Sequence, residues 1–292
     1  MIRLEKVSKS FGSKEVLKDI TFNIKKGEIL GLVGKNGAGK TTLISILAGL
    51  IDASSGEIYY QGSLIRDKNI KVGYLPDVPS FYDYLTVREY IDFLSQSQLS
   101  SDEIEQIIKV VGLQSNDKIK GLSRGMRQRL GMAAVLVNDP EIILLDEPSS
   151  ALDPEGRAEL SNLLCSLKKD GKTILLSTHI LTDMEKICDT VVFLKEGCVS
   201  KIVDVNDSNE QYEIKLTFKN PLEQVEELAG VTVVSETEII ISSTAEDIET
   251  QGIILKYLYD IKNPIIKIET KQISLDAIFN EVCLWENNLF VQ

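Results

Sequence analysis

Short runs of β-forming residues dominate the first 60 positions of the chain. Segments such as VLKDITFNIKKGEILGLVG cluster or alternate these residues between turn signals, which predicts several short strands. Farther along, EIILLD (141–146) and TILLST (173–178) are continuous apolar runs bounded by turn residues. Runs of this length and continuity are typical of parallel strands buried on both faces of a sheet.

Helical spacing separates these strand-like runs. TTLISILAGL (41–50) has a helical pattern, and apolar residues recur at helical spacing from Thr86 to about Val111, with a break near Ser100. The second segment predicts a helical insertion. Strands that alternate with helices around a glycine-rich loop favour an α/β core.

The polar break DVNDSNE (204–210) marks a change in character. After it, QYEIKLTFK predicts a strand, PLEQVEELAG a helix, VTVVSETEIIISS a hairpin turning at Ser235–Thr237, AEDIETQGIILKYLYDI a helix and PIIKIETKQ a strand. This order predicts a small α+β domain of the split βαβ, ferredoxin-like kind, with a terminal helix in SLDAIFNEVCLWENNLF. We therefore expect two domains, residues 1–203 and residues 204–292.

The composition, with 43% hydrophobic and 26% charged residues among 292, is ordinary for a globular protein. The longest apolar runs are far shorter than the roughly 20 residues of a membrane-spanning helix, and the N-terminus lacks a signal-peptide pattern. We therefore expect a cytosolic protein whose membrane role, if any, comes through a partner. The four cysteines share no short metal-type spacing, and a single histidine, His179, argues against a histidine-based metal site.

The net charge of −12 is concentrated in the C-terminal third. Residues 204–292 hold 17 Asp and Glu against six Lys and Arg, a balance of −11, so the remainder is nearly neutral. This acidity opposes non-specific nucleic-acid binding by the segment, and we expect no nucleic-acid partner. An acidic docking site and a solvated acidic surface both fit the pattern, and the solvated surface is the simpler interpretation.

A phosphate-binding loop follows the strand that ends near Val33. GLVGKNGAGKTTL matches G-x-x-x-x-G-K-[ST], and it lies between a strand and a helix as the motif requires. The loop backbone and the helix N-terminus would cradle anionic oxygens, Lys40 would reach the β- and γ-phosphates, and the Thr41 hydroxyl would bind Mg²⁺. A glycine-rich turn without a ligand is the alternative. The expected ATP-binding residues are Gly34, Lys35, Asn36, Gly37, Ala38, Gly39, Lys40, Thr41 and Thr42.

Two adjacent carboxylates end the apolar run EIILLDEP. An Asp in this place can hold the magnesium, usually through water, so Asp146 is a candidate metal ligand. Successive side chains leave a strand on opposite sides, so we expect Glu147 to face an attacking water as general base. If this pair stood alone in the sequence, the alternative interpretation would be two solvent-exposed acids at the end of a strand.

Five motifs occur in order: GKNGAGKTT, LSRGM, ILLDEP, SALD and STH. In their order and spacing, the chain resembles the ATP-binding cassette ATPases, the motor subunits of ABC transporters, over residues 2 to about 200. The resemblance implies a P-loop domain with β-rich and helical subdomains that hydrolyses ATP with Mg²⁺. It also implies a homodimer or heterodimer of cassettes around two ATP molecules.

The resemblance also implies roles for residues outside the phosphate-binding loop and the carboxylate pair. LSRGM resembles the signature LSGGQ, so Ser123 and Gly125 would bind the γ-phosphate held by the opposite subunit. His179 matches the switch histidine at the γ-phosphate, Asp153 lies in the loop that couples the subunits, and Phe11 matches the ring that stacks on adenine. For Phe11, a core position is the alternative.

The chain departs from the family at three positions. Arg124 and Met126 replace Gly and Gln of the signature, where a bulkier second residue could alter the backbone approach or add positive charge near phosphate. Asp77 occupies the place of a Gln that touches magnesium and relays to the membrane partner. A carboxylate can bind Mg²⁺ but cannot donate a hydrogen bond when it is ionised, so Asp77 is a doubtful metal contact.

An acidic residue at this place, a short helical insertion, one cassette and a C-terminal extension resemble the ATPases of two-component exporters for antibiotics, bacteriocins and lipids. The leading hypothesis is a motor that drives a transmembrane permease in a separate chain, at the inner face of the cell membrane. A cytosolic ABC ATPase acting on ribosomes or DNA is the runner-up, and a nucleotide-binding regulator without hydrolysis is a third possibility. The sequence does not identify the transported substrate.

Overall fold

The computed structural model describes residues 2–64, 70–205, 211–222, 231–244, 256, 259, 263–272 and 275–284. The chain divides into two compact units, Met1–Ile202 together with Val282–Gln292, and Val203–Glu281. The elements of the first unit are β1 (Ile2–Phe11), β2 (Lys14–Ile24), β3 (Ile29–Val33), α1 (Lys40–Leu47), β4 (Ser55–Tyr60), β5 (Ser63–Leu64), β6 (Val72–Leu75), α2 (Val87–Ser95), α3 (Ser101–Val110), α4 (Arg124–Leu136), β7 (Ile142–Asp146), α5 (Pro154–Lys169), β8 (Thr173–Ser177), α6 (Leu181–Ile187) and β9 (Thr190–Lys195), and β10 (Cys198–Asp204) runs across the division.

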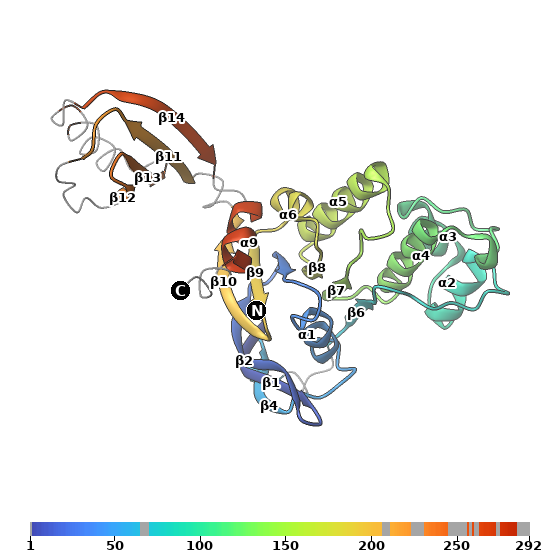
Figure 1. Ribbon diagram of the computed structural model, residues 1–292. Helices are drawn as coiled ribbons and strands as arrows, with labels where there is room; N and C mark the ends of the chain where they lie inside the picture. The colour runs from blue at the N-terminus through green and yellow to red at the C-terminus, as the bar shows by residue number, and fades with distance from the viewer. Residues whose placement is uncertain are drawn as a thin grey trace. The chain divides into compact units, whose positions relative to one another are not determined.

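The main sheet of the first unit has the order β10-β9-β3-β8-β7-β6 (Figure 1). Its neighbours from β9 to β6 pair in parallel, and β3, β7 and β8 are buried along their whole length. Parallel strands buried on both faces need continuous apolar sequences. The prediction of buried parallel strands at EIILLD and TILLST is therefore confirmed.

Helices cover both faces of this sheet. Leu30 and Leu32 of β3 share a buried cluster with Leu43 and Ile44 of α1. Gly31, which points to the opposite face because side chains alternate along a strand, lies against Met184 of α6. A second, antiparallel sheet of order β2-β1-β4-β5 adds its apolar residues to the cluster at α1.

The helical subdomain consists of α2, α3 and α4. Thr86 and Ser100 begin α2 and α3 with complete capping boxes. In each box the hydroxyl accepts a hydrogen bond from the backbone N–H of the Glu three residues later, and the carboxylate of that Glu accepts one from the backbone N–H of the cap residue. The predicted break near Ser100 is this second cap, so the predicted helical insertion is confirmed. The fold as a whole confirms the predicted P-loop α/β class with β-rich and helical parts.

The second unit contains an antiparallel sheet of order β12-β13-β11-β14. Its strands are β11 (Gln211–Phe218), β12 (Val231–Ser235), β13 (Glu238–Thr244) and β14 (Ile265–Gln272), and α9 (Leu275–Leu284) follows them. Leu216, Phe218, Ile239 and Ile241 form its buried cluster. The predicted hairpin is present as β12 and β13.

The strand order of the second unit is the order that a split βαβ arrangement requires. Most of the two segments predicted as its helices, 221–230 and 245–261, lies outside the described residues, so the ferredoxin-like assignment stays a proposal. The division falls one residue before the expected boundary, and Val282 groups with the first unit rather than with the accessory domain.

Candidate functional site

Four neighbouring parallel strands bring the motifs together. In the main sheet, β3, β8, β7 and β6 lie side by side, and parallel strands end at the same edge. The phosphate loop follows β3, Ser177 ends β8 with His179 two residues later, Asp146 ends β7 with Glu147 directly after it, and Asp77 follows β6. Ligands of open α/β sheets bind at this carboxyl edge, so the topology alone assembles a candidate site from four distant parts of the sequence.

Two glycines of the phosphate loop have steric reasons to be glycine. A side-chain carbon on Gly34 would lie 2.5 Å from the backbone oxygen of Leu194. Gly39 has a φ of 103°, and a side-chain carbon there would lie 2.5 Å from Leu17 Cδ2. Gly39 is also the N-cap of α1 and supplies no side-chain cap. The first backbone N–H groups of the helix are thus left for an anion, and no acidic residue lies in the first turn to compete.

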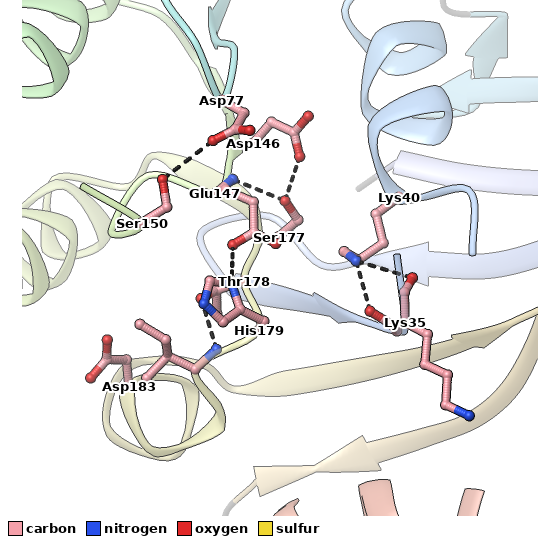
Figure 2. Close-up of polar contacts among 12 residues, drawn as sticks. Lys35, Lys40, Asp77, Asp146, Glu147, Ser150, Ser177, Thr178, His179 and Asp183 are labelled. Carbon is pink, nitrogen blue, oxygen red and sulfur yellow. Dashed lines mark hydrogen bonds and ion pairs between the residues drawn. The ribbon is translucent and has the colours of Figure 1, made fainter. Parts of the chain in front are cut away.

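Lys40 is buried beneath this loop. The residue is only 7% exposed, and Nζ donates to the backbone oxygens of Gly34 at 2.7 Å and Lys35 at 3.4 Å (Figure 2). The ammonium therefore lies inside the loop that would surround phosphate oxygens. Thr41, the next residue, is exposed at the start of α1, as a metal-binding hydroxyl must be.

Asp146 ends β7 in a buried position, 2% exposed. Ser177 Oγ, on the adjacent strand β8, donates a hydrogen bond of 2.6 Å to Asp146 Oδ1. The same Ser177 oxygen accepts from the backbone N–H of Glu147 at 3.0 Å. One hydroxyl therefore holds the carboxylate of Asp146 and the backbone of Glu147 at once (Figure 2).

Glu147 leaves the strand conformation immediately after Asp146. Its φ of 50° is unusual for a residue with a side chain, and the N–H bonds to Ser177 and the Ser150 N–H on its carbonyl hold it there. Its carboxylate, 16% exposed, lies 2.8 Å from His179 Nδ1. The strand alternation expected from the sequence therefore ends at Asp146. The turn at Glu147, and not the pleat of the strand, sets the direction of the Glu147 side chain.

His179 and Glu147 form a pair suited to proton transfer. His179 is 65% exposed. With the proton on Nδ1, it donates to the Glu147 carboxylate, which leaves Nε2 available to a ligand. Burial, and secondly the charge of Asp146, raise the pKa of the Tyr74 hydroxyl on β6.

Asp77 is exposed and lies beside the loop that follows Glu147. Ser150 Oγ donates to Asp77 Oδ1 at 3.2 Å, so the segment after β6 is linked to the segment after β7 (Figure 2). The structure gives Asp77 this structural partner. Its role as a metal contact stays a prediction.

The signature turn begins α4. Ser123 is its N-cap and accepts from the Met126 N–H at 3.2 Å, and no acidic residue lies in the first turn. Gly125 packs on the SALD loop, because a side-chain carbon there would lie 3.1 Å from the backbone oxygen of Ala151. The exposed Arg124 meets no such restriction. This helix N-terminus is therefore a second place suited to an anion.

Two further predicted residues have defined positions. Asp153 is the N-cap of α5 and accepts from the Gly156 N–H at 2.8 Å. Phe11 is 51% exposed at the end of β1, with Lys9 Nζ 5.1 Å from its ring centroid. The exposure removes the alternative of a core phenylalanine.

Comparison with known proteins identifies the family. The profile of the family described as ABC transporter matches residues 17–150. The lantibiotic transport ATP-binding protein SrtF of Streptococcus pyogenes is 36% identical over 201 residues, which cover 68% of this chain and 88% of SrtF. The chain belongs to the ATP-binding proteins of ABC transporters.

Other members of the ABC family extend this comparison. An uncharacterized ABC transporter ATP-binding protein of Synechocystis is 44% identical over 216 residues, 69% of this chain but only 61% of the Synechocystis protein. Among solved structures, a dimeric post-hydrolysis state of the cassette MJ0796 bound to ADP and Pi is 28% identical with a TM-score of 0.65, over 70% of this chain and 99% of that one. The chain is accordingly an ABC ATPase.

The described residues fit a magnesium ion held mainly by ATP. They contain no cluster of three or more His, Cys, Asp or Glu side chains that could hold a metal. Mg²⁺ does not need such a cage, because it commonly binds one or two protein oxygens together with phosphates and water. The buried Asp146 carboxylate and the Thr41 hydroxyl supply hard oxygen ligands of that kind.

Ser177 is a candidate site residue that the sequence reasoning missed. The sequence shows a hydroxyl at the end of an otherwise apolar run, but only the structure shows that it pairs in register with Asp146. Because Ser177 orients the candidate metal ligand, we expect Ser177→Ala to raise the Mg²⁺ concentration for half-maximal ATPase activity about 10- to 100-fold. A magnesium titration of ATPase activity measures this. Ser149→Ala, a buried serine in the loop after β7, is the control, and an equal effect of both changes would contradict a specific role for Ser177.

Proposed function

We propose that this ABC ATPase is the motor subunit of a two-component exporter, dimerising around two ATP and driving a permease in a separate chain. The observation that carries the proposal is a set of polar side chains gathered at one edge of the main sheet. The set consists of Lys40 in the phosphate loop and of Asp146, Ser177, Glu147 and His179 at the ends of the neighbouring strands. The likeness to SrtF, a lantibiotic transport ATP-binding protein, supports a role in transport, and the export direction is part of the proposal.

In the proposed reaction, the loop backbone and Lys40 bind the phosphates, and Thr41 and Asp146 hold the Mg²⁺. The metal supplies charge neutralisation to the phosphates. Glu147 takes the proton of the attacking water, and His179 orients the Glu147 carboxylate through Nδ1. Phe11 stacks on the adenine ring.

Dimerisation is supported by a second helix N-terminus suited to an anion, at the start of α4. The N-termini of α1 and α4 both lack acidic residues, and Ser123 is exposed beside the second. We propose that Ser123 and Gly125 of one subunit meet the γ-phosphate bound by its partner, and that Asp153 lies in the loop that couples the two. The dimeric MJ0796 cassette supports this arrangement.

An exposed aromatic surface is the proposed permease contact. It consists of Tyr82, Tyr84 and Phe93, each at least 51% exposed, and the ring centroid of Tyr82 lies 5.9 Å from that of Tyr84 and 5.9 Å from that of Phe93. Contiguous exposed aromatic side chains commonly mark protein interfaces. Tyr82 follows Asp77 in the same segment, and the hydrogen bond between Asp77 and Ser150 links that segment to the loop after Glu147.

The partner is expected to supply the membrane-spanning segments and to hold the ATPase at the inner face of the membrane. Among the described residues, no helix is long and apolar enough to cross a membrane. A cytosolic ABC ATPase acting on ribosomes or DNA is the alternative, and no feature of the site favours it.

Co-purification tests the motor assignment. Tagged Glu147→Gln protein is isolated with ATP from detergent-solubilised cells, and the bound proteins are identified by mass spectrometry. We expect a multi-spanning membrane protein. Recovery of ribosomal proteins or DNA without a membrane protein would support the alternative instead.

A variant of the aromatic surface sharpens this experiment. We expect Phe93→Ser to reduce recovery of the membrane protein several-fold while leaving the ATPase activity of the isolated chain unchanged, because Phe93 is remote in sequence from every predicted ATP ligand. Leu50→Ser is the matched control, since Leu50 and Phe93 are both 60% exposed. Equal recovery with Phe93→Ser and wild type would remove this surface from the permease contact.

A further inference from the structure

One edge of the sheet in the second unit is an exposed strand. Among the described residues, β14 ends the order β12-β13-β11-β14 and pairs with β11 alone (Figure 1). Every residue from Ile265 to Thr270 is exposed, including Ile266 at 63% and Ile268 at 62%. An edge strand presents a row of backbone N–H and C=O groups to which another strand can add. β14 is therefore a place where a strand of a second chain could extend this sheet.

Charged side chains on β14 restrict which strand can pair with it. Lys267 and Glu269 are two residues apart and so point to the same face of the sheet, and Lys267 Nζ lies 3.0 Å from Glu269 Oε1. Like charges directly opposite each other destabilise a strand pair, and opposite charges stabilise it. An antiparallel partner must therefore place an acid opposite Lys267 and a base opposite Glu269. Along the partner's own chain, this requirement is a base followed two residues later by an acid.

A second copy of β14 meets this requirement. Two identical antiparallel strands are related by a two-fold axis perpendicular to the sheet, so the numbers of opposite residues have an even sum. When Ile268 is opposite Ile268 of the second copy, each Lys267 is opposite the Glu269 of the other chain. A register centred on Lys267 or on Glu269 instead places like charges opposite each other. The charges therefore select the register centred on Ile268.

The charges on the neighbouring strands agree with this register. On the same face of the sheet, Lys215 of β11 is directly opposite Glu269, and its Nζ lies 3.1 Å from Glu238 Oε1 of β13. Acid, base and acid therefore alternate over β13, β11 and β14 up to the edge of the sheet. Lys267 of a second copy would continue this alternation on the next strand.

The composition of β14 differs from that of the segment around it. Residues 204–292 hold 17 acids against six bases, and two of the six bases, Lys267 and Lys271, lie on β14 with one acid, Glu269. Two copies can therefore meet at β14 although the segment as a whole is acidic. β12, at the other edge of the sheet, is five residues long and has no charged residue, so charge does not determine a register there.

We propose that β14 strands of two copies of this chain pair antiparallel, centred on Ile268, and join the two four-stranded sheets into one. This contact needs no nucleotide, and it goes beyond the dimer proposed around ATP. A single strand edge buries little surface, so the contact is weak and depends on protein concentration.

Sedimentation velocity of the full-length chain without nucleotide, from micromolar to near-millimolar concentration, measures the association. We expect wild type to shift from monomer towards dimer over this range. Lys267→Glu makes both positions acidic and Glu269→Lys makes both positions basic, so each variant places like charges opposite each other twice in the dimer. We expect each change to raise the dissociation constant at least about tenfold.

A mixture of the two variants separates an intermolecular role from a structural one. In a mixed dimer an acid is again opposite a base at each place, so the mixture should associate about as tightly as wild type. Mixing would not restore association if Lys267 and Glu269 only stabilised their own sheet. Lys219→Glu and Glu236→Lys make the same charge changes at exposed positions outside β14, and these controls should associate as wild type does.

A disulfide tests the register. Opposite residues of antiparallel strands have Cα atoms roughly 4.5–5.5 Å apart, within reach of a disulfide. Oxidation with copper–phenanthroline in air should therefore link Ile268→Cys chains into covalent dimers well above the wild-type background. Ile266→Cys is the matched control, because Ile266 is equally exposed but lies four residues, about 13 Å, from its counterpart in this register. Equal linking of the two variants would contradict the register.

Three results would overturn the contact itself: wild type that stays monomeric at every concentration, a mixture as monomeric as its components, or a control as weak as Lys267→Glu. Assemblies that grow beyond a dimer would indicate pairing of β14 with β12 and would overturn it equally. The dimer around ATP is tested separately, since Glu147→Gln combined with Lys267→Glu should still dimerise with ATP. If dimers form with ATP but wild type does not associate without nucleotide, the β14 contact fails and the proposed function stands.

Discussion

Replacing Glu147 with Gln is expected to lower the ATPase rate by at least about 100-fold while ATP binding is kept, since a positioned general base contributes roughly 10²–10⁴-fold. Gln has nearly the same shape as Glu but cannot take a proton from water. The backbone bonds from Glu147 N–H to Ser177 do not involve the side chain, so the unusual turn should persist. Single-turnover and steady-state ATPase measurements give the rate.

The same variant should accumulate ATP-bound dimers, because the step that separates them is blocked. Size-exclusion chromatography with light scattering, at saturating ATP, measures the mass. Glu155→Gln, an acid in the first turn of α5, is the control and should behave as wild type. A Glu147→Gln protein that remains monomeric at saturating ATP would contradict the sandwich, and near-normal hydrolysis would contradict the role of Glu147 as base.

Lys40→Ala is expected to weaken ATP binding by at least about tenfold, since hydrogen bonds to charged groups contribute about 1.5–3 kcal/mol. Lys40 lies beneath the loop with its ammonium bonded to the Gly34 and Lys35 carbonyls. With ATP bound, the phosphates would replace these carbonyl partners. Removing the charge leaves the loop with its backbone N–H groups alone.

Equilibrium titration with a fluorescent ATP analogue measures the affinity. Lys35→Ala is the control within the loop, because Lys35 is exposed whereas Lys40 is 7% exposed. We expect Lys35→Ala to have a much smaller effect. An unchanged affinity in Lys40→Ala would remove Lys40 from the phosphate site.

Much of the fold follows from local pattern. EIILLD and TILLST are too short for helices and too apolar for an exposed sheet, and they form the buried strands β7 and β8. Thr86 and Ser100 each precede a Glu by three residues, and this spacing locates the starts of α2 and α3. These features depend on neighbours in sequence, so a single sequence reveals them.

The arrangement of the candidate site could not be predicted from residues that are neighbours in the sequence. Asp146 and Ser177 are 31 residues apart, and their hydrogen bond exists because β7 and β8 pair in register. Glu147 was expected to continue the alternation of a strand, yet its backbone turns to a φ of 50° because Ser177 and Ser150 hold it. Such contacts depend on sheet order, which the local pattern does not determine.

The roles of the site residues are the central claim, and a mixture of two inactive variants tests it most directly. Lys40→Ala damages the phosphate loop and Gly125→Asp damages the signature turn, where a side chain would approach the Ala151 carbonyl. If each site combines the loop of one subunit with the signature turn of the other, a mixed dimer has one site with both parts intact. The account predicts that the mixture hydrolyses ATP although neither variant does so alone. A mixture as inactive as its components would contradict the shared site.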